Sequence, residues 1–193
     1  MLDTHARKYV QPVIQKTADS LLKAGLSANQ VTVLSFVIGA STGLFVYFGH
    51  PWIAVSALWL SGYLDAVDGS MARATRPSPF GTVMDVTFDR IVEISVIVGV
   101  AFLYPDIMWA ALLLMASIVI SMTIFLTVGN VSENNGVKSF RYQAGLAERT
   151  EGFLFLTAMM VFPGIVLWVT LAFFAVELFT AGQRFMEAKR LLT

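Results

Sequence analysis

Cysteine is absent from the sequence, and charged residues are scarce. Only 13% of the 193 residues are charged, roughly half the share found in soluble domains, whereas 56% are hydrophobic and the mean hydropathy is +0.72. Without cysteine, the chain is not a disulfide-stapled secreted module and holds no metal through thiolates. So hydrophobic a sequence is not intrinsically disordered. We therefore expect lipid to surround most of the chain.

An excess of charge of either sign is also missing. The 13 basic and 13 acidic residues give a formal net charge of zero. No overall field favours a nucleic acid, and we expect no nucleic-acid partner. Residues 1–8 lack the apolar core and the cleavage site of a secretory signal, so we expect them to be retained.

The first 28 residues are predicted to form a segment of their own, followed by a membrane domain over residues 29–193. Between Gln11 and Lys23 the apolar side recurs at steps of three and four residues, at Val13, Ile14, Thr17, Leu21 and Leu22. This spacing predicts an amphipathic helix that lies in the membrane interface, with Pro12 in its first turn. The alternative is a loosely held cytoplasmic arm.

Long uncharged runs set the number of membrane spans. A bilayer core of about 30 Å takes about 20 helical residues. The run from Gln30 to Leu64 is too long for one crossing and breaks at Gly49-His50-Pro51. Tyr104-Pro105-Asp106 is a second break, and Phe162-Pro163-Gly164 divides a stretch that would otherwise be one tilted span. We therefore predict an all-α integral membrane protein with six transmembrane helices, over 29–48, 52–73, 81–103, 107–128, from about 147 to the third break, and beyond it.

The positive charges favour six spans over five. With six helices, the turns at the three breaks share one side of the membrane. These three bare turns contain no Lys or Arg, and all 13 Lys and Arg residues fall on the other side. The positive-inside rule makes the basic side, with both termini, cytoplasmic in the cell membrane. Five aromatic residues close to the bare turns fit a belt at the outer interface: Tyr47, Trp52, Tyr104, Trp109 and Trp168.

Carboxylates stand inside segments that are otherwise apolar. Intramembrane acids are costly and are therefore functional candidates. Asp65 and Asp68 share one helix face, and Asp85 and Asp89 share a face of the next helix. We expect antiparallel packing to gather all four, and two divalent cations would neutralise them. Oxygen ligands favour magnesium, manganese or calcium over zinc.

Small residues and an arginine accompany these acids. Gly69, Ala72 and Gly81 would leave room beside the metals, and Arg73 stands one turn beyond Gly69. A metal pair, the space left by the small residues and a guanidinium group together form a site that could bind a diphosphate. The alternative for the small residues alone is helix packing.

The run Asp65-Ala66-Val67-Asp68-Gly69-Ser70-Met71-Ala72-Arg73, followed by Gly81-Thr82-Val83-Met84-Asp85-Val86-Thr87-Phe88-Asp89, resembles a known signature. The signature is D-x-x-D-G-x-x-A-R, then G-x-x-x-D-x-x-x-D, of the CDP-alcohol phosphotransferase family. Every fixed position matches, although 74–80 is one residue shorter than the family's spacer. Residues 26–32 are similar to the family's approach to its first membrane helix, with Ala28 in place of the usual proline.

The resemblance implies a role for each matching residue. Asp65, Asp68 and Asp85 would hold two divalent cations, Mg²⁺ or Mn²⁺, while Asp89 would lie near the metals and act as the catalytic base. Arg73 would meet the diphosphate. The remaining positions implied to bind the CDP moiety are Gly69, Ala72, Gly81, Asn29 and Thr32.

The resemblance also implies the reaction. A phosphatidyl group would pass from a CDP-alcohol, CDP-diacylglycerol first among them, to a small acceptor alcohol with release of CMP, in phospholipid biosynthesis at the membrane. The family often forms homodimers. Lys138, Arg141 and Arg149 are candidates for binding a phosphate on the acceptor, but the interpretation we favour is that they are ordinary positive-inside residues.

Two other function classes share some of these features. A divalent-cation or proton-coupled transporter also carries acids within a helical bundle. A membrane scaffold without catalysis would leave the aspartates unexplained. Glu93, one turn beyond Asp89, is either a pathway acid or the partner of Arg90, and we expect the pairing.

Overall fold

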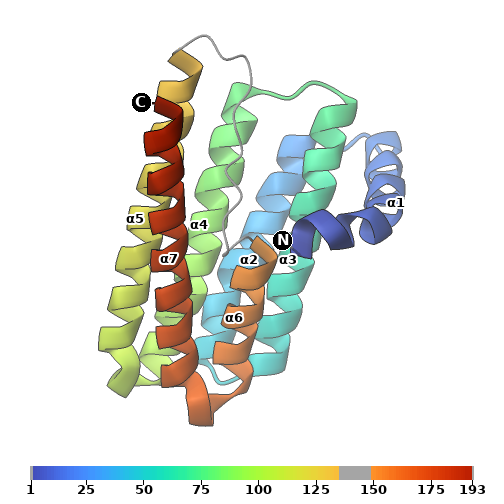
Figure 1. Cartoon of the computed structure of the whole chain (residues 1–193). Coiled ribbons are helices and arrows are strands. Elements are labelled where there is room, and N and C mark those ends of the chain that lie inside the picture. The colour runs from blue at the N-terminus through green and yellow to red at the C-terminus, as the bar shows by residue number, and fades with distance from the viewer. Residues whose placement is uncertain (1, 135–148, 193) are drawn as a thin grey trace. The chain divides into compact units, whose positions relative to one another are not determined.

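The computed structural model describes residues 2–134 and 149–192, which are almost entirely helical and contain no strand (Figure 1). The sequence breaks predicted most of the helix ends to within a few residues. Seven α-helices and two short 3₁₀ turns follow one another in these residues: α1 (Leu2–Lys23), α2 (Ala28–Tyr47), α3 (Pro51–Ala74), α4 (Pro79–Leu103), η1 (Pro105–Ile107), α5 (Met108–Asn134), α6 (Arg149–Val161), η2 (Pro163–Ile165) and α7 (Val166–Leu192).

Local signals explain where the site-forming helices begin. Ser27 caps α2, since its side chain accepts a hydrogen bond from the backbone N–H of Gln30 while the Gln30 side chain accepts one from the N–H of Ser27. Ser78 caps α4 in a similar way, and Pro79 takes the first helical position, where its missing N–H costs nothing. Gly49, with φ of +73°, makes the turn between α2 and α3.

Helix α1 differs from its sequence prediction. It begins at Leu2, so Pro12 lies inside the helix and not in its first turn. Ile14 and Ala18 are buried against α2 and α3, but Val13, expected on the same apolar face, is 58% exposed. The N-terminal helix is therefore partly packed on protein, and its position in the membrane interface stays a prediction.

The chain divides into two compact units, of which Thr4–Pro105 is one. Within it, α2 packs against both α3 and α4. The α2 and α4 backbones approach closely where Gly43 meets Gly99, because neither residue has a Cβ. On the α3 side, the Ser35 hydroxyl donates to the backbone carbonyl of Ser61 at 2.8 Å. Helix α2 thus fixes α3 and α4, which carry the acids.

The other unit contains α5, α6 and α7, with α7 packed against both of the other helices. Phe173 of α7 is buried and stacks on Phe155 of α6, with ring centroids 4.9 Å apart. Arg184 is also buried, and its guanidinium donates to the Ser121 hydroxyl of α5 at 3.0 Å and lies over the Phe125 ring. A buried arginine thus ties α5 to α7.

Three segments of the described chain are long and apolar enough to cross a membrane: Ala28–Tyr47, Pro105–Val131 and Pro163–Arg190. Helices α3 and α4 have similar lengths but carry the clustered charged residues, and the described part of α6 has 13 residues. Several crossings are therefore supported, while the count of six stays a prediction.

Candidate active site

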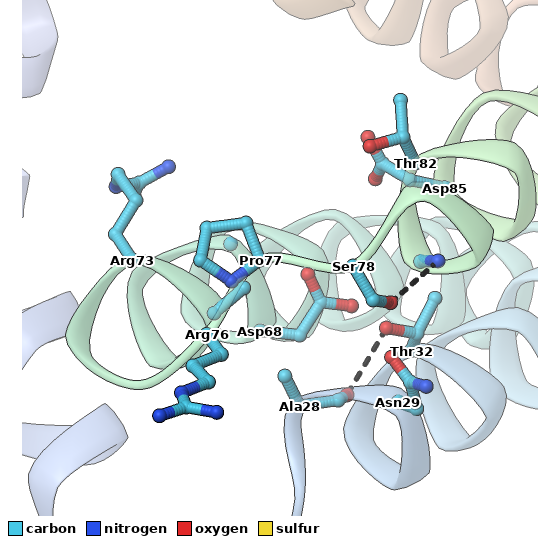
Figure 2. A pocket seen from close by; sticks show the side chains of 13 residues that line it. Ala28, Asn29, Thr32, Asp68, Arg73, Arg76, Pro77, Ser78, Thr82 and Asp85 are labelled. Carbon is cyan, nitrogen blue, oxygen red and sulfur yellow. Dashed lines mark hydrogen bonds between the residues drawn. The ribbon is translucent and has the colours of Figure 1, made fainter.

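A pocket of about 200 Å³ lies where three helix ends and a loop of the first unit meet (Figure 2). The first turn of α2 and the first turns of α4 border it on two sides, and the last turns of α3 lead into the 76–78 loop. In the view of Figure 2, Asp68 lies between the arginines at the end of α3 and the pair Thr82 and Asp85 on α4. The lining residues come from the two signature segments, the spacer between them and the start of α2: Ala28, Asn29, Thr32, Asp68, Gly69, Ala72, Arg73, Arg76, Pro77, Ser78, Gly81, Thr82 and Asp85.

Three of the four expected aspartates come together beside this pocket. Asp65, Asp68 and Asp85 each offer one carboxylate oxygen, and these oxygens all lie within 4.8 Å of one another. Asp68 is 4% exposed, while Asp65 is half-buried. The i, i+3 spacing on α3 brings the first two together, and α4 supplies the third because both helices pack on α2. Sequence spacing predicted this grouping.

The acid cluster fits a hard divalent cation. Its donors are all carboxylate oxygens, which Mg²⁺ and Mn²⁺ prefer, and no histidine or thiol is among them. Three like charges so close together would repel strongly without a counter-charge. The chemistry of the donor set therefore supports a cation at this point.

Asp89 lies one helical turn beyond Asp85 on α4 and is not part of the group of three. Its separation along the helix matters, because the family resemblance implies a second role for Asp89, that of the catalytic base. The next turn carries Glu93, which is buried and forms an ion pair with Arg90. The predicted Arg90–Glu93 pairing is thereby confirmed.

Two glycines leave space where side chains of the pocket lie close to the helix backbone. An added Cβ on Gly81 would come within 2.9 Å of the Ser78 hydroxyl and 3.3 Å of the Asn29 side-chain oxygen. An added Cβ on Gly69 would lie 3.3 Å from Arg73 Nη1. The structure thus brings four of the expected donor-binding residues to the pocket from three helices: Asn29 from α2, Gly69 and Arg73 from α3, and Gly81 from α4.

The remaining expected donor-binding residues also line the pocket. Thr32 is buried, and its hydroxyl donates to the Ala28 carbonyl at 3.0 Å, whereas Ala72 adds a small side chain on α3. Because the first turns of α2 and α4 line the pocket, backbone N–H groups at both helix starts are close to it. Such N-terminal turns favour anions.

Sequence analysis missed three polar residues of the pocket, namely Arg76, Ser78 and Thr82. Arg76 was assigned only to the positive-inside side. Ser78 had a recognisable signal, since serine before proline is typical of a helix start, and its hydroxyl accepts from the Gly81 N–H at 2.9 Å. Thr82 carries no sequence signal beyond its position next to Gly81.

The structure does not test the candidate acceptor residues. Lys138 and Arg141 lie outside the described residues. Arg149 starts α6 in the other unit, with its guanidinium 5.5 Å from the centre of the Phe153 ring. Their role in binding an acceptor therefore stays a prediction.

The fold and the pocket define a multi-pass helical membrane protein with a cluster of three carboxylates beside a pocket that is also lined by two arginines. The family model described as CDP-alcohol phosphatidyltransferase matches residues 26–180, and the chain belongs to this family. It is thus a transferase of substituted phosphate groups that acts in phospholipid biosynthesis.

Several curated proteins are similar in sequence. The phosphatidylinositol phosphate synthase of Mycobacteroides abscessus is 27% identical over 161 residues, which cover 82% of this chain and 73% of that protein. The archaetidylinositol phosphate synthase of Pyrococcus horikoshii is 33% identical over 102 residues, or 52% of this chain and 54% of that protein. The inner membrane protein YnjF of Escherichia coli is 28% identical over 171 residues, or 84% and 83%.

Solved structures share the fold. The phosphatidylinositol phosphate synthase of Mycobacterium tuberculosis with CDP-DAG bound matches with a TM-score of 0.75 and 21% identity, covering 92% of this chain and 94% of that one. The same enzyme in complex with manganese and citrate matches with a TM-score of 0.74, covering 91% and 88%. At this identity, the likeness establishes the fold.

Proposed function

We propose that this protein transfers a phosphatidyl group from CDP-diacylglycerol to the hydroxyl of a small acceptor, with release of CMP. One observation carries the proposal: the acid cluster of Asp65, Asp68 and Asp85 lies beside a pocket lined by Gly69, Arg73 and Gly81, in a chain of the family. Each of these residues stands at a fixed position of the signature.

The donor would bind with its diphosphate between the acids and the arginines. Arg73 and Arg76 line the pocket and supply guanidinium donors for phosphate oxygens. The first turns of α2 and α4 add backbone N–H groups, which favour negative charge. Gly69, Ala72 and Gly81, with Asn29 and Thr32, leave space and polar groups for the cytidine. The solved relative with CDP-DAG bound supports this class of donor.

Two divalent cations, Mg²⁺ or Mn²⁺, are proposed at the acid cluster, with Asp65, Asp68 and Asp85 as ligands and Asp89 nearby. When bound, the cations would neutralise charge on the diphosphate and hold it in place. The oxygen-only donor set supports this assignment, as does the relative solved with manganese.

Asp89 is proposed as the catalytic base. Its carboxylate would take the proton from the acceptor hydroxyl as that oxygen forms a bond to the phosphorus that carries the lipid. The bond from this phosphorus to the oxygen of CMP breaks, and CMP leaves with the electron pair. The rest of the pocket acts chiefly by positioning the two reactants in line.

The acceptor is proposed to be an alcohol that carries a phosphate. Inositol phosphate is proposed first among the candidates, because two similar proteins are named phosphatidylinositol phosphate synthase. Lys138, Arg141 and Arg149 are the basic residues proposed to hold the acceptor phosphate, since a guanidinium or an ammonium group suits that ligand.

The proposal includes the position of the chain in the cell membrane. Six crossings would place both termini and the pocket on the cytoplasmic side, with residues 1–28 as an interfacial helix and residues 29–193 as the membrane domain. With six crossings every basic residue falls on one side, and the positive-inside rule then favours this orientation. The protein is proposed to act as a homodimer, in keeping with the family.

CMP release from purified protein tests this function. CDP-diacylglycerol is supplied with magnesium and, in separate reactions, inositol phosphate, glycerol phosphate, inositol, glycerol or serine. We expect CMP with at least one acceptor and the highest rate with inositol phosphate. No CMP with any acceptor, together with divalent-cation uptake by proteoliposomes that contain the protein, would indicate a transporter instead.

A further inference from the structure

Helix α3 has two opposite faces with different neighbours. Asp68, Gly69 and Ala72 line the pocket on one face. On the other, Tyr63, Val67 and Met71 recur at a spacing of four and pack against α1. With 3.6 residues per turn, Ser70 and Arg73 fall along the border between these faces. They are thus placed to connect the N-terminal helix with the pocket.

The Ser70 hydroxyl makes that connection. Ser70 is 2% exposed, and its Oγ accepts a hydrogen bond from Arg73 Nη2 at 3.1 Å. The same oxygen accepts a longer one from Gln11 Nε2 of α1 at 3.4 Å. A hydroxyl oxygen has two lone pairs, so it can accept from both donors at once.

Helix α1 is itself fixed on α3. The hydroxyls of Thr17 and Tyr63 are hydrogen-bonded at 2.6 Å, and Ile14 and Ala18 are buried beside Val67. Gln11 therefore presents its amide from a helix that is anchored at several points. Its hydrogen bond to Ser70 is held in place by this packing.

Arg73 is confined from a second side by Gly69. The 3.3 Å separation between Nη1 and an added Cβ at Gly69 shows that the guanidinium lies close against the α3 backbone there. Gly69 thus leaves space for the Arg73 guanidinium, and the Ser70 hydroxyl accepts its hydrogen bond. The Arg73 side chain is exposed, so these two neighbours restrict a group that would otherwise sample many rotamers.

We propose that Ser70, supported by Gln11 of α1, is a positioning residue that holds the Arg73 guanidinium ready for the diphosphate of the donor. The inference rests on the proposed function, because it takes the diphosphate as the ligand of Arg73. An arginine held in place before binding loses less conformational freedom on binding, which favours affinity. The N-terminal helix thereby acts on the donor site without contacting the donor.

Calorimetric titration with CDP and with CMP in the presence of manganese tests the proposal. Removing one hydrogen bond to the guanidinium should weaken CDP binding by about 3- to 10-fold in Ser70→Ala. CMP, which lacks the second phosphate, should lose less. Gln11→Ala should change CDP affinity in the same direction by a smaller factor. In CMP-release assays, Ser70→Ala should raise the KM for CDP-diacylglycerol and leave kcat near the wild-type value.

Thr75→Ala is the matched control. It also removes a hydroxyl near the end of α3, but that hydroxyl donates to the Met71 carbonyl at 2.9 Å and is not bonded to Arg73. We expect CDP affinity close to that of the wild type. A combined Ser70→Ala and Arg73→Ala protein should bind CDP no more weakly than Arg73→Ala alone, because the effect acts through Arg73.

Equal losses for CDP and CMP in Ser70→Ala, or an added loss in the Arg73→Ala background, would overturn the proposal. Should Ser70→Ala fail to fold, Gln11→Ala decides, and CDP affinity equal to that of the wild type in this variant would count against the proposal. Ser70→Thr, which keeps the oxygen, should retain the preference for CDP over CMP. A wild-type protein that neither binds CDP nor releases CMP would instead overturn the proposed function.

Discussion

At the scale of single residues, Asp85 and Asp89 have different surroundings although both are on α4. Asp85 contributes an oxygen to the group of three carboxylates, while Asp89 lies one turn further along the helix. Two aspartates on the same helix therefore need not have the same role. A substitution that keeps the size of the side chain but removes its charge can distinguish a metal ligand from a catalytic base.

Asp89→Asn should lower turnover by about 10²-fold or more, because a general base contributes about 10²–10⁴-fold to a rate. CDP should still bind in the presence of manganese, since the group of three remains. Asp68→Asn should weaken binding and turnover together, because it removes a buried ligand of the proposed cations. Calorimetry and CMP release on both variants provide the comparison. Near-normal turnover in Asp89→Asn would contradict its role as base.

The sequence predicted the carboxylates and the signature residues of the pocket better than the residues at the connection between α3 and α4. Asp65, Asp68 and Asp85 could be placed together because helical periodicity fixes which side chains share a face. Arg76 and Thr82 could not, because their positions depend on the path of the chain between α3 and α4. Spacing alone does not specify a loop path.

At the scale of helices, α2 holds the two acid-bearing helices in place. Its contact with α4 depends on Gly43 and Gly99, whose backbones approach too closely for any side chain. The same contact sets the position of Asp85 relative to α3. Packing at a distance from the pocket therefore determines the geometry of the acid cluster.

Gly43→Ala should reduce the free energy of unfolding by about 1–3 kcal/mol, because overpacking against backbone atoms forces helices apart. The added Cβ would come within 2.6 Å of the Ser95 carbonyl carbon. Thermal unfolding in detergent, followed by circular dichroism, measures the change. Gly182→Ala in α7 is the control, since nothing lies within 4 Å of its added Cβ, and its melting temperature should equal or exceed that of the wild type. Equal melting temperatures for Gly43→Ala and wild type would contradict the proposed packing role.

Helix boundaries were largely predictable from the sequence, whereas the length of α1 was not. Proline and glycine mark the turns before α3 and α4, so these ends were visible. Pro12 suggested a start near Gln11, yet the helix runs through it from Leu2. A proline inside a helix removes one hydrogen bond but does not necessarily end the helix. Tertiary packing of Ile14 and Ala18 stabilises the segment beyond what local propensity indicates.

At the scale of the whole molecule, the distribution of basic residues predicts the orientation of the chain. Single cysteines in an otherwise cysteine-free protein can be labelled without background. Ala74→Cys, at the C-terminal end of α3, should react with an impermeant maleimide only when the cytoplasmic face is open. Gly164→Cys should react from the outside, and the added side chain meets nothing within 4 Å. Labelling of Ala74→Cys from the outside of intact cells would contradict the proposed topology.

The sequence and the structure give different information about the number of membrane crossings. The bare turns and the positive-inside rule indicate six helices through the membrane. By length and composition, three described segments qualify, since the acids and basic residues of the signature lower the hydropathy of α3 and α4. The residues that make the site are those that make its helices look less like membrane spans.

The dependence of CMP release on the acid cluster and on divalent metal is the most direct test of the account. Purified wild-type protein, supplied with CDP-diacylglycerol and the best acceptor, should release CMP with magnesium or manganese, stop with a chelator, and resume when metal is added back. Asp65→Asn, Asp68→Asn and Asp85→Asn should each bind manganese more weakly and need more of it for activity. CMP release that continues in the chelator, or manganese affinity unchanged in all three variants, would contradict the central claim.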